Sequence, residues 1–196
     1  LSAPSGTGKT TITRELRKAI PDLEYSVSVT TRQPRRGERD GVDYEFVSKP
    51  EFERAAAAGD FLEHAVVFDN YYGTKLSSVE KTLSGGKDIL LDVDIQGALQ
   101  IKQKHDGIFI FVIPPSLEVL EERLRSRGTD MEQEIVKRIA RAKEEIANYV
   151  NYDYVIYNDT IPDCVQKLRS IITAEKCNVS RNKNILKEFD IKQKGG

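Results

Sequence analysis

The sequence predicts an α/β fold in which a parallel sheet has helices on both faces and carries a small β-rich insertion and a helical lid. Short apolar runs rich in β-branched residues alternate with stretches whose apolar residues recur at helical spacing. A glycine-rich loop near the start runs directly into a helical pattern, and residues 32–74 interrupt the alternation. Parallel sheets of this kind bind ligands beyond the carboxyl ends of their strands, so the site is expected there.

The glycine-rich loop, APSGTGKT at residues 3–10, nearly matches the phosphate-loop (P-loop) pattern G-x-x-x-x-G-K-[ST]. Gly6 and Gly8 can adopt positive φ, so that successive backbone N–H groups turn toward a phosphate at the start of the next helix. Lys9 adds a charge for the β- and γ-phosphates, and the Thr10 hydroxyl suits Mg²⁺. We therefore expect ATP or GTP binding, with a chance glycine-rich turn as the alternative. The residues expected to contact the triphosphate are Ala3, Pro4, Ser5, Gly6, Thr7, Gly8, Lys9, Thr10 and Thr11.

The surroundings of the loop bear on this prediction. Residues 11–16 continue in a helical pattern, which is the context that the loop requires. A strand should precede the loop, and Leu1 and Ser2 are expected to be its last residues. Ala3 stands where the pattern has its first glycine, so the match is imperfect and its effect on ATP affinity stays open.

The remaining elements follow in order along the chain. Strands are expected at residues 25–30, 89–93, 108–113 and 154–157, three of them as buried parallel strands. Three apolar stripes at helical spacing are expected to pack into the core, namely Leu117, Leu120 and Leu124, then Ile135, Ile139, Ala142 and Ile146, and finally Val165, Leu168 and Ile172.

Two segments do not follow the alternation. In residues 32–74, the alternating run at residues 42–47 predicts a strand, and Ser48 with Glu51 forms a capping box for a helix that Gly59 ends. Such an insertion is a candidate subdomain for a second substrate. Residues 125–130, RSRGTD, join two helices and concentrate charge around a glycine, which is typical of a lid.

Composition excludes several function classes. A chain of 196 residues with 39% hydrophobic residues can form one domain with a sizeable core. A net charge of −1 argues against a protein that coats nucleic acid, and no apolar run approaches the length of a membrane span. Cys164 and Cys177 form no C-x-x-C pair, so we expect packing residues in a reduced, cytoplasmic setting.

Six further motifs, in order along the chain, resemble those of guanylate kinases. They are SVSVTTRQPR at 26–35, GVDY at 41–44, FLE at 61–63, NYYGT at 70–74, LDVDIQG at 91–97 and RGT at 127–129. The resemblance covers residues 2 to about 176. It implies an enzyme that transfers the γ-phosphoryl group of ATP to GMP, and to dGMP, with Mg²⁺.

The resemblance also implies how one domain, residues 1–196, is organised. The core would comprise residues 1–31, 75–124 and 150–177, the GMP-binding subdomain residues 32–74, and the lid residues 125–149. The polar tail at 178–196 lies beyond the resemblance, and we expect a variable extension or a partly ordered helix there.

The family pattern assigns the GMP site to specific residues. The GMP phosphate would be held by Arg32, Arg35, Tyr44 and Tyr72. Glu63 would accept hydrogen bonds from the guanine ring N–H and amino group, which adenine does not offer as a pair, while Ser28 and Thr74 would meet the carbonyl side. A solvated charge run is the alternative for the arginines, and a surface carboxylate the alternative for Glu63.

Two carboxylates follow the apolar run at 89–91, at a Walker B position. The resemblance places Asp92 toward GMP and makes Asp94 a partner of Mg²⁺ through water. Because residues i and i+2 share one face of a strand, both are expected to be functional, with helix capping as the alternative for one of them.

Arginines over the phosphates are expected because phosphoryl transfer depends on charge neutralisation. By family position these are Arg127 and Arg138, while surface pairing with Glu134 is the alternative for Arg138. Arg141 is a weaker candidate, and Asn158 with Asp159 matches the adenine-side loop without a catalytic role.

Two other functions remain as alternatives. A guanylate-kinase-like interaction module binds peptides and lacks a working phosphate loop, whereas Lys9 and Thr10 are intact here. A P-loop kinase with another acceptor is disfavoured by Glu63, Ser28 and Thr74. The expected partners are ATP and GMP, with no nucleic acid or membrane, and the sequence leaves open whether the protein is a monomer or a homo-oligomer.

Overall fold

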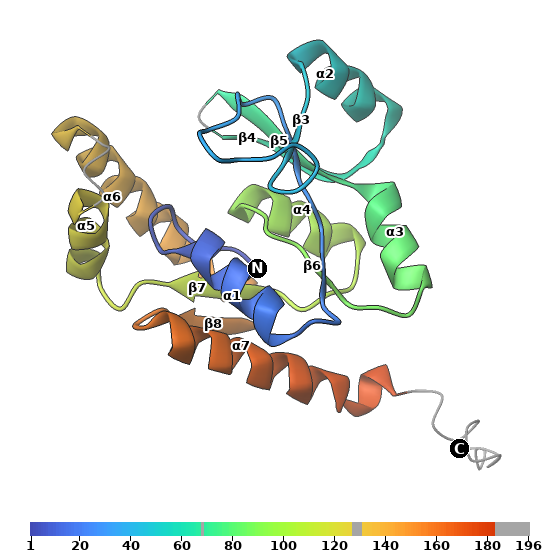
Figure 1. Cartoon of the computed structure of the whole chain (residues 1–196). Coiled ribbons are helices and arrows are strands. Elements are labelled where there is room, and N and C mark those ends of the chain that lie inside the picture. The colour runs from blue at the N-terminus through green and yellow to red at the C-terminus, as the bar shows by residue number, and fades with distance from the viewer. Residues whose placement is uncertain (68, 127–130, 183–196) are drawn as a thin grey trace.

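The computed structural model describes residues 1–67, 69–126 and 131–182, and its core is built on parallel strands (Figure 1). Strand β1 pairs with β6 and strand β7 with β8, both in parallel. These strands are β1 (Glu24–Tyr25), β6 (Ile89–Leu90), β7 (Ile110–Ile113) and β8 (Tyr154–Tyr157).

Leu1 and Ser2 lie between the two pairs of strands and connect them. The Ser2 N–H donates to the Ile110 carbonyl at 3.0 Å, and the Val112 N–H donates to the Ser2 carbonyl at 2.8 Å. On the other side, the Val93 N–H donates to the Leu1 carbonyl at 3.2 Å. The two residues expected to end the strand before the phosphate loop thus lie in the middle of the parallel core, where Ser2 forms an isolated parallel bridge with Phe111.

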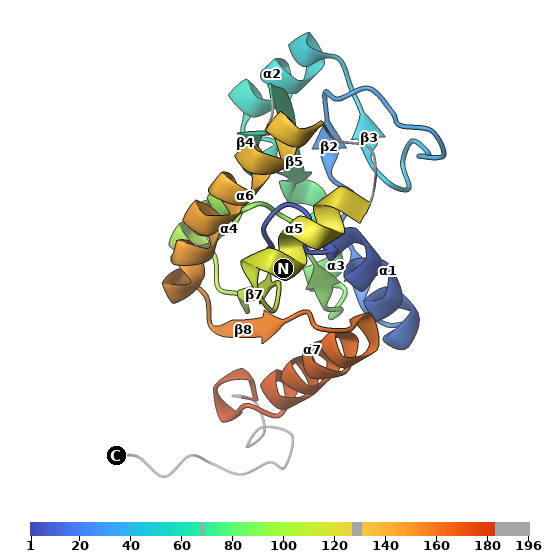
Figure 2. The same ribbon diagram turned by 90° about the vertical axis from the view of Figure 1, so that its left-hand side faces the viewer.

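Helices cover both faces of this core. Helices α1 (Lys9–Ala19) and α7 (Ile161–Lys176) share one cluster of buried residues with β7 and β8, including Ile12, Leu16, Val112, Ile156 and Leu168. A second cluster contains residues of helices α3 (Leu76–Ser84) and α4 (Ile95–Lys104), namely Val79, Ala98 and Ile101 with Leu62 and Val93. Figures 1 and 2 show α4 and α7 on opposite sides of the core strands.

The insertion and the residues that flank it, from Val29 to Lys75, form a second sheet, with helix α2 (Lys49–Ala58) beside it. Its strands lie in the order β3-β2-β5-β4, and only the β2–β3 pair is parallel. They are β2 (Val29–Thr30), β3 (Glu45–Phe46), β4 (Phe61–Val67) and β5 (Asn70–Lys75). The predicted capping box is confirmed, because Ser48 accepts from the Glu51 N–H while the Glu51 side chain accepts from the Ser48 N–H, and Gly59 ends α2 with φ 79°.

Four strand predictions were wrong in their extent. The strands expected at 89–93 and 108–113 are shorter, because β6 ends at Leu90 and β7 begins at Ile110. Residues 25–30 were predicted as one strand, but Tyr25 pairs with Leu90 in the core and Val29 pairs with Gly73 in the insertion. Both halves of residues 25–30 have the apolar residues of a buried strand. The sequence pattern therefore does not show where the chain passes from one sheet to the other. Of the expected strand at 42–47, only β3 forms.

The predicted lid, residues 125–149, begins at the end of helix α5 (Leu117–Ser126), contains helix α6 (Glu132–Ile146) and ends within the 3₁₀ turn η1 (Ala147–Asn151). Most of both stripes pack as expected, since Leu120, Leu124, Ile135 and Ala142 form a third buried cluster with Ile139 packed against it. Leu117 and Ile146 are only half-buried and do not belong to this cluster. Residues 127–130 of the predicted connection lie outside the described residues. Figure 2 shows the lid helices from the side, with the insertion above them.

The chain ends and cysteines complete the description. The 3₁₀ turn η2 (Val179–Arg181) follows α7, and residues 183–196 of the predicted tail lie outside the described residues. Cys164 is buried as expected, but Cys177 is exposed, so the packing role predicted for Cys177 was wrong. Among residues 1–67, 69–126 and 131–182, no helix has both the length and the apolar character needed to span a bilayer.

Candidate functional site

A cleft of about 370 Å³ lies between the phosphate loop, the insertion and helix α6. It lies beyond the carboxyl end of β6, where the fold class predicted a site. The predicted site residues that line it are Ala3, Pro4, Ser5, Gly6, Gly8, Lys9, Thr10, Thr11, Ser28, Arg35, Tyr44, Glu63, Tyr72, Asp92, Asp94 and Arg138. Thr7, Arg32 and Thr74 are described but do not line the cleft, and Arg127 lies outside the described residues.

The phosphate loop has the backbone conformation that its glycines predict. Gly6 and Gly8 have φ of 90° and 99°, and Gly8 is the N-terminal cap of α1. A Cβ atom on Gly6 would lie 2.8 Å from Leu124 Cδ2, so helix α5 also requires glycine there. Thr7 is fully buried, and its carbonyl oxygen accepts a hydrogen bond from Asn158 Nδ2 at 2.6 Å. The loop is therefore held in shape from two sides.

Lys9 and Asp92 form an ion pair across the cleft. Lys9 Nζ lies 2.6 Å from Asp92 Oδ1 and donates to the Val93 carbonyl at 3.0 Å. Burial lowers the pKa of Lys9, but the attraction of Asp92 outweighs it and leaves the pKa above its ordinary value. Lys9 is therefore charged, and a bound phosphate would compete with Asp92 for it.

Asp94 begins helix α4 and does not lie on a strand. Strand β6 ends at Leu90, and Asp94 caps α4 by accepting from the Gly97 N–H at 2.8 Å. The expectation that Asp92 and Asp94 share one face of a strand was wrong, and the capping alternative describes Asp94. Both carboxylates nevertheless line the cleft.

The cleft has the oxygen ligands that Mg²⁺ prefers. The exposed Thr10 lines it together with Asp92 and Asp94. Across the part of the chain that the structure describes, no group of three or more His, Cys, Asp or Glu side chains is arranged to hold a metal ion. This set of ligands fits an ion that is coordinated mainly by nucleotide phosphates and water.

Glu63 is a carboxylate on β4 with little access to solvent. It is 6% exposed, and Oε1 accepts a hydrogen bond from Thr74 Oγ1 at 2.6 Å. Burial raises the pKa of Glu63 to about 7, although the Thr74 hydroxyl group opposes this shift. Thr74 lies opposite Glu63 across the β4–β5 ladder and is 1% exposed, so its hydroxyl group meets Glu63 and does not line the cleft. Ser28, also buried, does line the cleft.

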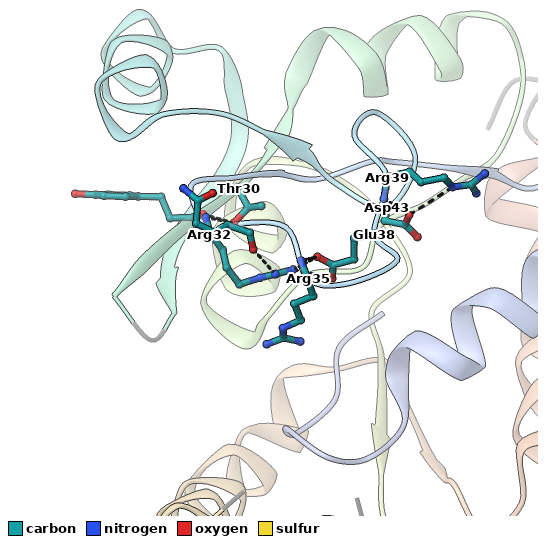
Figure 3. A network of polar contacts seen from close by, with 8 residues as sticks. Thr30, Arg32, Arg35, Glu38, Arg39 and Asp43 are labelled. Atoms are coloured by element: carbon teal, nitrogen blue, oxygen red, sulfur yellow. Dashed lines mark hydrogen bonds and ion pairs between the residues drawn. The ribbon is translucent and has the colours of Figure 1, made fainter. Parts of the chain in front are cut away.

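The two phosphate-binding arginines of the insertion differ in position (Figure 3). Arg35 lines the cleft, and Figure 3 shows its side chain pointing away from Glu38. Arg32 Nη2 instead lies 2.8 and 3.0 Å from the two carboxylate oxygens of Glu38, and Nη1 donates to the Gln33 carbonyl at 2.7 Å. Glu38 also accepts from the Arg35 N–H at 2.7 Å, so one carboxylate organises both arginines.

Two tyrosines stand beside these arginines. The rings of Tyr44 and Tyr72 meet edge to face with centroids 6.0 Å apart, and both residues line the cleft. The Arg32 guanidinium lies 5.3 Å from the centroid of Tyr44. Burial raises the pKa of Tyr44, with Asp92 adding to the shift, so its hydroxyl group keeps its proton and can donate to an anion.

The comparison with known families identifies the chain. A family model described as guanylate kinase matches residues 1–175. The chain belongs to the guanylate kinase family. A guanylate kinase of Caldanaerobacter subterraneus subsp. tengcongensis is 51% identical over 187 residues, which cover 94% of this chain and 90% of that protein. One from Clostridium perfringens is 50% identical over 190 residues, covering 96% of this chain and 88% of that protein.

A solved structure agrees with this assignment. The crystal structure of guanylate kinase from Anaplasma phagocytophilum matches with a TM-score of 0.78 at 33% identity. The match covers 97% of this chain and 94% of that chain. The resemblance and the α/β fold class inferred from the sequence are thereby confirmed.

In this member of the guanylate kinase family, the sequence reasoning missed two carboxylates at the site. One is Glu38. The other is Glu145 on α6, whose Oε1 accepts from Arg141 Nε at 2.8 Å and whose Oε2 accepts from the Ser5 N–H at 3.4 Å. The spacing of Arg138, Arg141 and Glu145 is a usable signal, because residues three and four apart share one helix face. All three line the cleft.

Proposed function

We propose that the protein transfers the γ-phosphoryl group of ATP to GMP, and also to dGMP, in the cytoplasm, with Mg²⁺ as cofactor and GDP or dGDP as product. The observation that carries the proposal is the juxtaposition in one cleft of an intact phosphate loop with Lys9 and of the buried carboxylate Glu63. Membership in the guanylate kinase family supports the same reaction.

Glu63 is proposed to select guanine. Its carboxylate would accept hydrogen bonds from the ring N–H and the amino group, with Ser28 on the carbonyl side. Adenine offers no such donor pair, so its binding would leave a buried carboxylate without partners. Thr74 would act on the base through Glu63, because its hydroxyl group donates to Oε1.

The GMP phosphate is proposed to lie among Arg35, Tyr44 and Tyr72, which line the cleft. Arg32 would join them from its place beside Glu38, offering the hydrogen atoms that Glu38 and Gln33 do not use. A guanidinium group provides five donors, which makes such shared binding possible.

The triphosphate of ATP is proposed to occupy residues 3–11, with Lys9 exchanging Asp92 for the β- and γ-phosphates. Thr10 and, through water, Asp94 would hold Mg²⁺. When bound, that ion neutralises charge on the phosphates during transfer. Arg138, and Arg127 by family position, would stabilise the charge of the transferring group, so this chain supplies positioning and electrostatics rather than a covalent intermediate.

Closure of the insertion and of the lid around both nucleotides is proposed to exclude water. A closed site prevents transfer of the phosphoryl group to water, which would waste ATP. The ion pairs of Arg32 with Glu38 and of Arg141 with Glu145 keep these arginines ordered before the nucleotides arrive.

The test is ADP release from ATP and Mg²⁺ with GMP, dGMP, AMP, CMP and UMP offered separately, beside a control without acceptor. We expect turnover with GMP and dGMP alone. Turnover with another base in place of guanine would overturn the acceptor assignment, and ATP binding without any turnover would point to an interaction module. In the Glu63→Ala variant, the KM for GMP should rise far more than the KM for ATP.

A further inference from the structure

Gly97 on helix α4 lies directly against the carboxylate of Glu63. A Cβ atom on Gly97 would lie 2.3 Å from Glu63 Oε2 and 2.9 Å from Cδ. Both distances are far shorter than van der Waals contact. No side chain larger than hydrogen fits at this position while Glu63 keeps its place.

The backbone conformation gives no other reason for glycine here. Gly97 lies inside α4, and its φ is not among the positive values found at six other glycines. Glycine inside a helix costs about 0.5–1 kcal/mol relative to alanine. Helix stability alone would favour alanine, so the close approach of Glu63 is the feature that accounts for glycine.

The carboxylate is held between two elements. On one side Thr74 Oγ1, from β5, donates to Oε1 at 2.6 Å, and on the other side Oε2 rests on the first turn of α4 at Gly97. The Gly97 N–H already donates to Asp94 Oδ1 at 2.8 Å. Gly97 therefore contributes space rather than a hydrogen bond, and the positive end of α4 favours the charged carboxylate.

We propose that Gly97 is a specificity-determining positioning residue, whose missing side chain lets Glu63 present both oxygens to the guanine base. The proposal rests on the guanine-binding role proposed above for Glu63. With alanine at position 97, Oε2 must move while Thr74 still holds Oε1. One of the two acceptors for the ring N–H and the amino group is then lost.

The experiment is steady-state kinetics of Gly97→Ala with GMP, with IMP and with ATP as the varied substrate. IMP lacks the amino group, so the ratio of kcat/KM for GMP to that for IMP reports the second hydrogen bond. We expect the KM for GMP to rise about tenfold or more and this ratio to fall, with the KM for ATP unchanged. The matched control is Gly107→Ala, whose new Cβ would meet only the Phe109 ring at 3.6 Å, and it should behave as the wild type.

A double variant separates positioning from general damage. In a Glu63→Ala background, a Cβ atom at position 97 no longer meets a carboxylate. Adding Gly97→Ala should therefore cause no further loss in kcat/KM for GMP. The proposal would be overturned if the losses of the two single variants add up in the double variant. It would also be overturned if Gly97→Ala alone changes the KM values for GMP and ATP equally, or leaves the KM for GMP unchanged. If Gly97→Ala alone fails to fold, folding of the double variant would support the contact and failure of both would refute it.

The proposed role of Glu63 is judged separately. If Glu63→Ala leaves the KM for GMP unchanged, the guanine-binding role fails and the proposal for Gly97 fails with it. If Glu63→Ala raises the KM for GMP while Gly97→Ala does not, only the proposal for Gly97 fails.

Discussion

The burial of Glu63 predicts a measurable effect on stability. The pKa of this carboxyl group is about 7 in the fold, against an ordinary value of 4.5 that applies to the unfolded chain. Each tenfold change in proton affinity corresponds to about 1.4 kcal/mol, so holding the charge in this site costs the unliganded fold about 3 kcal/mol at high pH. Glu63→Gln removes the charge and keeps an oxygen atom that can accept from Thr74.

The direction of the pH dependence follows from the raised pKa. The folded protein holds the Glu63 proton up to about pH 7, whereas the unfolded chain releases it near pH 4.5. The stability that the protonated group contributes is therefore fully present below pH 4.5 and is lost as the pH rises through 7. The free energy of unfolding of Glu63→Gln should match that of the wild type within about 1 kcal/mol near pH 5 and exceed it by about 3 kcal/mol at pH 8.

The assay is urea unfolding without nucleotide at pH 5 and pH 8, supported by thermal melts. For a chain of this length, 1 kcal/mol corresponds to about 2–4 °C in Tm, so the gain at pH 8 should exceed about 6 °C. The control is Glu122→Gln, a change at an exposed carboxylate on α5. This variant should change the free energy of unfolding by the same amount at pH 5 and at pH 8. A gain from Glu63→Gln that is equal at both pH values, or a loss at pH 8, would refute the reasoning.

Three further predictions concern other contacts. Lys9→Ala should lower kcat by about 10²-fold or more while thermal unfolding stays cooperative, because the phosphates lose a preorganised charge; near-normal turnover would reject the phosphate-loop assignment. Glu38→Gln should raise the KM for GMP several-fold without changing that for ATP, since Arg32 Nη2 loses the charged carboxylate whose two oxygens it contacts; equal KM changes would refute this role. Ser48→Ala should lower the free energy of unfolding by about 1 kcal/mol through loss of the α2 cap. Denaturant unfolding measures that loss, and no change would contradict it.

Features set by neighbours in sequence were predicted well. The phosphate loop, the capping box of Ser48 and the stripes of α5, α6 and α7 depend on residues within a few positions of one another. Positive φ at glycine, a side-chain cap and helical periodicity are local properties, so one stretch of sequence is enough to predict them.

Other predictions failed where the chain passes between elements. Residues 25–30 satisfy the alternation of a single strand, yet they supply strands to two sheets. Asp94 follows an apolar run as a strand residue would, yet it caps α4. In both cases several local structures fit the pattern equally, and packing against distant segments selected one.

The sequence by itself determined the fold class, the phosphate loop and the set of residue types that the site needs. Only the tertiary structure decided their partners, as in the contacts of Lys9 with Asp92 and of Ser5 with Glu145, the latter 140 positions away. It also decided that Glu63 is buried against Gly97 and Thr74. The reason is physical, because strand register, burial and the pKa of a buried carboxyl group depend on neighbours in space, which local periodicity does not specify.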